Sequence, residues 1–362
     1  MIPIFPLLLA TLSPDDTGGP VPGGRRDVIV TVGGTRLGVE EVLLDTLAGV
    51  RYRVGGSERD LPASQVLRIE YRDEPPALRR AREKRAGGEF AAASRALAAA
   101  MEARGVRPWL REEVAYESAE VLEAWGATEE GKTEEAAEAY RAFTESHVSS
   151  RRRPAALLGR SRCLRALQRH EEALALLEEA EPASSLLGEG AQLEVLFEKA
   201  QTLLAAGRAG EARMSLGTLE GRIPVRPPGS LSSLLARVRA SQGDCLLAEG
   251  RPAEALAHFR RLLAEAGTAF ALRATARAGE GEALLAAGRV REATFALAEA
   301  RATGPAGLPS VPRATYLLAE CHRRLAGEEP DAERRARSYL AEVANRHPST
   351  PWAGKARRAL GE

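Results

Sequence analysis

One phrase recurs along most of this chain and limits what the chain can fold into. A glycine or polar turn is followed by an alanine, then by a large residue four positions on and a small or apolar residue three further. Aligned on that alanine, the copies recur every 37 to 43 residues, at Ala93, Ala136, Ala173, Ala212, Ala255, Ala293 and Ala336. A helical repeat of this length is typical of a solenoid, in which each two-helix unit packs on the next.

The composition fits closely packed helices. The chain of 362 residues is 44% hydrophobic but only 4% aromatic, so its core has to be built from Leu and Ala. Both are strong helix formers. The 51 basic and 50 acidic residues leave a net charge of +1. This balance argues against a dedicated nucleic-acid binder, which needs a basic surplus on at least one face.

The repeated phrase resembles the tetratricopeptide repeat (TPR). That motif has a small residue at its eighth position, a Gly-led turn near the fifteenth, Ala at the twentieth, a large residue at the twenty-fourth and Ala at the twenty-seventh. The fifth unit matches with Gly243, Gly250, Ala255, Phe259 and Leu262, and the sixth with Gly281, Gly288, Ala293, Leu297 and Ala300. The spacing exceeds the standard 34 residues, so we expect longer connections between units.

The resemblance implies a mainly α fold for residues 74–362. We expect an α-solenoid of about seven TPR-like helical hairpins, with a C-terminal capping helix from about Pro351 to Leu360. The phrase that begins at Tyr339, with His347-Pro348-Ser349-Thr350, also partly resembles the ending of envelope TPR proteins.

Residues 26–72 differ from the repeats and predict a small β-domain. β-branched runs and period-two alternation separated by Gly-Gly turns indicate strands near 27–32, 36–47, 50–54 and 66–71. The segment Leu61–Tyr71 resembles part of the SH3-like or Sm-like β-barrels found at the front of bacterial envelope repeat proteins. The resemblance implies a small β-barrel that caps the repeats or binds RNA or proline-rich peptides.

Residues 1–25 are interpreted as a signal-like segment and a linker. Ile2–Leu12 has the length of the hydrophobic region of a secretory signal, although no Lys or Arg precedes it. Ser13–Gly24 is rich in Pro, Gly and Asp, as linkers are. We expect a periplasmic or envelope-associated protein, with a cytoplasmic one as the alternative. No stretch is apolar and long enough to span a membrane as a helix.

Several catalytic and dinucleotide-binding motifs are missing from the sequence. It has no G-x-S-x-G, H-E-x-x-H or G-x-G-x-x-G. Gly126–Thr133 (GATEEGKT) has the spacing of a phosphate-binding loop, but it falls at the turn that leads into the second copy of the helical repeat. Cys163, Cys245 and Cys321 lie far apart in helical patterns, and we expect them to be buried thiols without a disulfide. The five histidines are scattered over different units. We therefore expect no enzyme, no metal, no cofactor and no small-molecule substrate.

The TPR resemblance also implies a concave face, lined by the first helix of each unit, that binds another protein or a peptide segment. The groove-facing positions of the motif carry mixed charge and are Arg162, Arg165, Glu194, Phe197, Gln201, Arg237, Asp244, Thr275 and Glu282. We expect a non-catalytic protein–protein interaction scaffold. The alternative is nucleic-acid or peptide binding through the barrel with the repeats as a spacer. Its basic and aromatic cluster would be Arg51, Tyr52 and Arg53.

Overall fold

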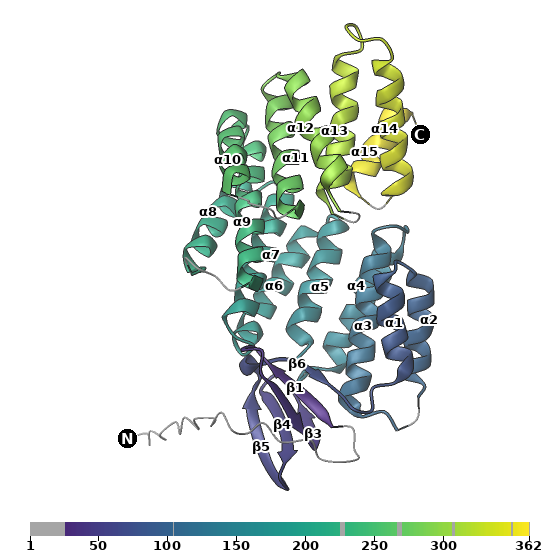
Figure 1. The fold of residues 1–362 in the computed structure, drawn as a ribbon, viewed down its shortest axis with the longest axis vertical. Coiled ribbons are helices and arrows are strands. Elements are labelled where there is room, and N and C mark those ends of the chain that lie inside the picture. Colours follow the sequence, from purple (N-terminus) through teal and green to yellow (C-terminus); the bar gives the residue numbers. More distant parts are fainter. Residues whose placement is uncertain are drawn as a thin grey trace.

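The fold consists of a β region followed by a curved array of helices. The computed structural model describes residues 26–103, 105–224, 229–265, 270–305, 308–348 and 350–361. The predicted signal-like segment and linker at 1–25 therefore lie outside the described residues. Figure 1 shows the strands gathered at one end of the molecule, below the helices.

The described helices form seven antiparallel hairpins and one terminal helix. The first helices of the units are α1 (Pro76–Ala86), α3 (Pro108–Gly126), α5 (Arg153–Ala166), α7 (Glu189–Ala205), α9 (Gly229–Ala248), α11 (Phe270–Ala286) and α13 (Ser310–Arg324). The second helices are α2 (Phe90–Met101), α4 (Lys132–Ser146), α6 (His170–Ser185), α8 (Ala209–Arg222), α10 (Pro252–Glu265), α12 (Val290–Thr303) and α14 (Ala332–Arg346). The last helix, α15 (Pro351–Leu360), packs on α14. The predicted solenoid and its terminal helix are confirmed.

Each second helix buries the two positions that define the repeat. The seven aligned alanines, from Ala93 to Ala336, are at most 2% exposed. The large residues four positions later are equally buried, and they are Leu97, Tyr140, Leu177, Leu216, Phe259, Leu297 and Leu340. Positions four apart share one face of a helix, so this pair forms the buried stripe of every second helix.

The best-matching units pack a large ring against glycines. A β-carbon on Gly243 would lie 2.4 Å from Cζ of Phe259, and one on Gly279 would lie 2.2 Å from the same atom. Phe259 is therefore held between a glycine of its own unit and a glycine of the next. Tyr140 packs in the same way on Gly159 of the following unit, where a β-carbon would lie 2.3 Å from its ring. These contacts leave no room for a methyl group.

We predict that Gly279→Ala destabilises the solenoid by about 1–3 kcal/mol, because the new methyl group must displace the fully buried ring of Phe259. The control is Gly217→Ala in α8, where the glycine is exposed and a β-carbon would meet nothing within 4 Å. There the change should be neutral or stabilising by up to about 1 kcal/mol. Urea unfolding of both variants measures the difference, and equal effects would contradict the packing account.

The turns inside the units use left-handed backbone. Gly207, Gly250 and Gly288 have φ values of 79°, 72° and 77°, and each ends a first helix. The amide N–H of Arg251, just after Gly250, donates to the carbonyl oxygen of Leu246 at 2.9 Å, which closes the helix end. In the third unit Gln168 occupies this place with φ 62°. Glycine tolerates this conformation best, which explains the predicted Gly-led turns.

The β region contains six strands in two antiparallel sheets of three. The strands are β1 (Asp27–Thr31), β2 (Arg36–Val39), β3 (Glu41–Asp45), β4 (Gly49–Val54), β5 (Ser57–Pro62) and β6 (Val66–Glu70). Their orders are β2-β1-β6 and β3-β4-β5. Strand β5 was not predicted, because SERDLP carries four exposed polar residues and little alternation.

The topology differs from the predicted small β-barrel, because the strands form two separate sheets. No ladder of the described strands joins the two sheets into a closed barrel. The chain turns from one sheet into the other at Glu40, whose N–H donates to the carbonyl oxygen of Arg53. The two sheets enclose one apolar core, whose buried members include Ile29, Val42 and Leu61.

A buried ion pair attaches the β region to the solenoid. Asp27 in β1 is fully buried, and its carboxylate accepts hydrogen bonds from both terminal nitrogens of Arg107 at 2.7 and 3.0 Å. Backbone N–H groups of Val42 and Arg72 also donate to it, at 2.8 and 2.9 Å. Burial alone would raise the pKa of Asp27, but these donors lower it overall. Arg107 precedes α3, so the pair joins the β core to the connection between the first two units.

Two further contacts attach the β region to later connections. Asp45 in β3 accepts hydrogen bonds from Arg151 at 2.8 and 3.1 Å, and the N–H of Leu47 donates to the carbonyl oxygen of Ser149. Gly188, between α6 and α7, lies against Ser64. The β region therefore contacts three successive connections between units and braces units one to four, instead of only capping the free end.

We predict that Asp27→Asn lowers the free energy of unfolding by about 3–5 kcal/mol, because it removes the fully buried one of the two carboxylates, Asp27 and Asp73, that pair with Arg107. Asp60→Asn is the matched control, since it removes an ion pair with Arg51 that is open to solvent. That control should cost less than about 1 kcal/mol. Denaturant unfolding measures the stability of both variants. Similar losses of unfolding free energy would contradict the conclusion that the Asp27–Arg107 pair holds the β region on the solenoid.

Candidate protein-binding groove

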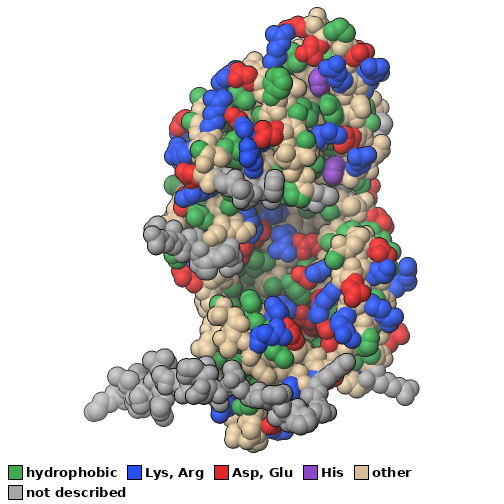
Figure 2. Space-filling model, viewed as in Figure 1, with side chains coloured by type: hydrophobic (Ala, Val, Ile, Leu, Met, Phe, Trp, Pro, Cys, Tyr) green, Lys and Arg blue, Asp and Glu red, His purple; other side chains and the backbone are tan. Residues whose placement is uncertain are grey.

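The first helices form the inner face of the array. Consecutive first helices contact one another from α3 to α13, whereas consecutive second helices make marginal contact at most. The side on which helices approach more closely is the concave side of a curved array. In Figure 1 both ends of the array bend toward the same side, and Figure 2 shows a hollow between them whose walls carry acidic, basic and apolar side chains.

The structure places all nine predicted groove residues on these first helices. Arg162 and Arg165 lie on α5; Glu194, Phe197 and Gln201 on α7; Arg237 and Asp244 on α9; and Thr275 and Glu282 on α11. Each of them contacts a side chain of another first helix, as the pairs below show. The prediction treated these residues as a surface for a partner, but it did not foresee these contacts between them.

The N-terminal half of the inner face is a chain of ion pairs. Arg162 donates to Glu123 of α3 at 2.6 and 3.0 Å. Arg165 donates to Glu198 of α7 at 2.6 Å. Burial would lower the pKa of Arg162, but the carboxylates of Glu123 and Glu198 raise it overall. Arg162 therefore stays charged, and its charge is compensated inside the groove.

Phe197 and Arg237 continue this chain toward α9. Arg237 donates to both oxygens of Glu194 at 3.0 Å, and its guanidinium lies over the ring of Phe197 at 4.3 Å from the centroid. Phe197 is only 5% exposed, so it forms the floor of the groove and presents little surface to a partner. Gln201 donates to the hydroxyl of Ser241 at 2.7 Å.

In the C-terminal half of the inner face, one arginine links the first helices. Arg313 of α13 donates to Asp244 of α9 at 2.8 Å and to Glu282 of α11 at 2.6 Å. It therefore joins three first helices and spans a whole unit. Burial would lower the pKa of Arg313, but the two carboxylates raise it overall. Thr275 contacts Ser310 of α13, with 3.4 Å between the two hydroxyl oxygens.

Sequence reasoning missed Glu123, Glu198, Ser241 and Arg313, which pair with the predicted residues. A signal was present, because opposite charges recur one repeat apart, as in Glu123 with Arg162 and Glu194 with Arg237. Such pairs can be found once the units are aligned. The contact of Asp244 with Arg313 skips a unit, so it depends on the curvature and could not be read from the spacing.

The cluster proposed for nucleic-acid binding is not a free basic surface. Arg51 is paired with Asp60 at 2.9 Å and Arg53 with Glu58 at 3.2 Å across the strands β4 and β5. Tyr52, between them, is 7% exposed and belongs to the β core. No stacking platform of the kind that binds single strands is formed by these three residues.

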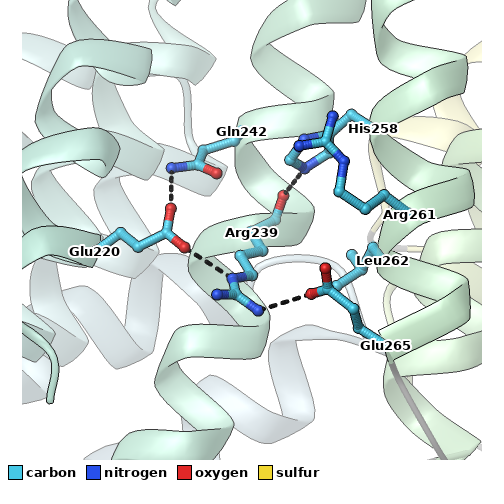
Figure 3. Close-up of a pocket in the computed structure, with 7 residues that line it drawn as sticks. All are labelled: Glu220, Arg239, Gln242, His258, Arg261, Leu262 and Glu265. Carbon is cyan, nitrogen blue, oxygen red and sulfur yellow. Dashed lines mark hydrogen bonds and ion pairs between the residues drawn. The ribbon is translucent and has the colours of Figure 1, made fainter. Parts of the chain in front are cut away.

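A pocket of about 210 Å³ opens between α8, α9 and α10, and Figure 3 shows its lining. Arg239 crosses it, donating to Glu220 at 2.8 Å and to Glu265 at 3.0 Å. Nε2 of His258 lies 2.7 Å from the carbonyl oxygen of Arg239, which fixes the imidazole. Arg239, Glu220, Glu265 and His258 are thus bonded to one another, and the described residues that line the pocket include no hydroxyl or thiol nucleophile.

The three cysteines are free and buried, as predicted. Burial raises the pKa of the Cys163 and Cys245 thiols to about 12 and that of Cys321 to about 11. A thiol nucleophile needs the opposite shift. Among the described residues there is no group of three or more His, Cys, Asp and Glu side chains placed to hold a metal, and no helix that could cross a membrane.

Comparisons with known proteins agree with this geometry. The family model described as "Tetratricopeptide repeat" matches residues 121–186, which run from α3 to the end of α6. A tetratricopeptide repeat protein from Parabacteroides merdae ATCC 43184 shares 14% identity, with 79% of this chain and 98% of that chain covered and a TM-score of 0.53. No curated protein sequence matches this chain.

NprR, solved in complex with its cognate peptide NprX, is a second structural match. It shares 12% identity over 78% of this chain and 81% of that chain, with a TM-score of 0.53. At such identities the likeness concerns the fold alone. The protein is therefore a TPR-like α-solenoid preceded by a small β region of two sheets.

Proposed function

We propose that this protein is a non-catalytic scaffold that holds a segment of another protein against the inner face of its solenoid. The observation that carries the proposal is the continuous inner face of first helices, on which all nine predicted groove residues meet. The peptide bound by NprR, a protein of the same fold, supports this kind of ligand. The buried thiols with raised pKa, and the ion pairs that Arg239 forms across the pocket, support a role without catalysis.

The paired charges limit how a partner can bind. Arg162, Arg165, Arg237 and Arg313 already have carboxylate partners, so a strongly charged segment would have to break existing pairs. A segment of mixed or low charge can instead use the remaining lone pairs and N–H groups without removing any pair. We therefore expect the groove to select by shape and hydrogen bonding, with affinity that depends weakly on salt.

We also propose that the protein acts in the bacterial cell envelope. The apolar run Ile2–Leu12 and the partial likeness of the C-terminal phrase to envelope TPR proteins support this location. A cytoplasmic scaffold would use the same groove. The proposed location and the proposed binding site are therefore tested by separate experiments.

We predict that Arg162→Glu with Arg165→Glu reduces recovery of the partner by about tenfold or more, because two like-charge contacts then replace two ion pairs on the groove wall. The control is Arg169→Glu with Glu172→Arg, which exchanges an exposed pair at a turn. Full-length tagged protein would be cross-linked in its source cells, purified and examined by mass spectrometry. Loss of the partner in the control as well would contradict a groove site.

A charge exchange shows whether these side chains touch the partner. Arg165→Glu with Glu198→Arg rebuilds the pair in reverse. Arg237 keeps its bond to Glu194 but loses its 3.7 Å contact with Glu198. If the exchange restores recovery, the pair serves to hold the groove in shape. If recovery stays low while the fold is intact, the partner contacts Arg165 itself.

A further inference from the structure

The sheet β2-β1-β6 presents a basic outer face. In its register Val30 lies opposite both Arg36 and Arg68, and Val28 lies opposite Glu70. Residues opposite one another in antiparallel strands share a face, and Val28 and Val30 share a face because they are two residues apart. Arg36, Arg68 and Glu70 therefore lie on one face of this sheet, with Glu70 beside the two arginines. Arg26 and Arg72 extend the same rows by two residues. We call Arg26, Arg36, Arg68 and Arg72, together with Arg79 of the adjacent α1, the basic face.

A cleft of about 260 Å³ opens where this face meets α1. Its lining comes from the start of β1, the end of β6 and the first turn of α1, and consists of Arg26, Val28, Glu70, Tyr71, Arg72, Glu74 and Arg79. Arg26 before β1, Arg72 after β6 and Arg79 of α1 therefore line one opening together with the apolar Val28. Of the three arginines, Arg72 also donates to the carbonyl oxygen of Glu40 and to the carboxylate of Glu41. The cleft lies on the β region and α1, away from the ion pairs of the groove.

The carboxylates of the cleft are already neutralised. Glu70 accepts hydrogen bonds from Arg36 at 2.6 and 3.1 Å and from Arg68 at 3.0 and 3.2 Å. Glu74 accepts a hydrogen bond from Arg82. Arg26 and Arg79 have no hydrogen-bond or ion-pair partner among the described residues. Among the described residues, the charges of Arg26 and Arg79 in the cleft are therefore not compensated by an ion pair.

We propose that the basic face binds a carboxylate-rich segment of a protein. Guanidinium groups bind carboxylates through paired N–H donors, and Arg26 and Arg79 offer such donors at no cost to an existing ion pair. Nucleic acid fits less well, because Tyr71, the one aromatic residue of the lining, has its hydroxyl on Asp45 and its ring under Arg107. This site stands apart from the groove and does not depend on the function proposed for it.

The test measures binding of fluorescein-labelled hexaglutamate to the full chain by fluorescence anisotropy at about 50 mM and about 200 mM salt. The variant Arg26→Glu/Arg79→Glu removes the two unpaired cations. The control Arg80→Glu/Arg95→Glu makes the same change in net charge at two exposed arginines outside the cleft, which also have no partner among the described residues. Arg26→Gln/Arg79→Gln repeats the test without adding negative charge. An oligothymidine of similar charge is titrated in parallel.

We expect hexaglutamate to bind the wild type more weakly at the higher salt. Its affinity should fall by about tenfold in Arg26→Glu/Arg79→Glu, fall by less in the Gln variant and stay within about twofold in the control. An equal loss in the control, or no binding to the wild type at the lower salt, would overturn the site. Tighter binding of oligothymidine through the same two arginines would overturn the assignment to a protein segment.

Discussion

The solenoid depends on the large buried residue of each second helix, which in two units is an aromatic ring packed against glycine of a first helix. Phe259 fits between Gly243 and Gly279 only because neither glycine has a β-carbon, and Tyr140 meets Gly159 in the same way. This close approach brings successive first helices into contact while the second helices stay apart. This difference in spacing between first and second helices curves the array and creates an inner face. The shape of the groove therefore depends on the packing of small and large residues.

Because the first helices lie close together, their polar side chains form hydrogen bonds and ion pairs with one another. Arg162, Arg165 and Arg237 pair with carboxylates of neighbouring units, and Arg313 joins two carboxylates on two other helices. Removing one member would leave a charge in a partly buried place, so these pairs specify the register of the units. The groove is therefore largely preformed. The β region adds to this by fixing three successive connections through Asp27, Asp45 and Gly188.

The repeat phrase was enough to predict the helices, because burial at Ala255 and Phe259 recurs with a fixed spacing in every unit. It also predicted that the nine candidate groove residues lie on first helices, which is where the structure has them. Alignment of the units could have shown the pairs one repeat apart, but not the bond of Asp244 to Arg313, which depends on curvature over a whole unit. Strand β5 was missed because its residues are exposed and charged. The brace through Asp27 and Arg107 joins positions 80 residues apart, and no local signal marks it.

The most direct test of the account is site-specific photo-cross-linking in the source cells. A photoreactive amino acid would replace Gln201 on the inner face, and in a second variant Met214, which is exposed on the second helix α8. The account predicts that the position of Gln201 cross-links to one defined protein and the position of Met214 does not. Cross-links from Met214 alone, or none from Gln201 while the full-length protein still recovers its partner, would contradict a binding site on the inner face.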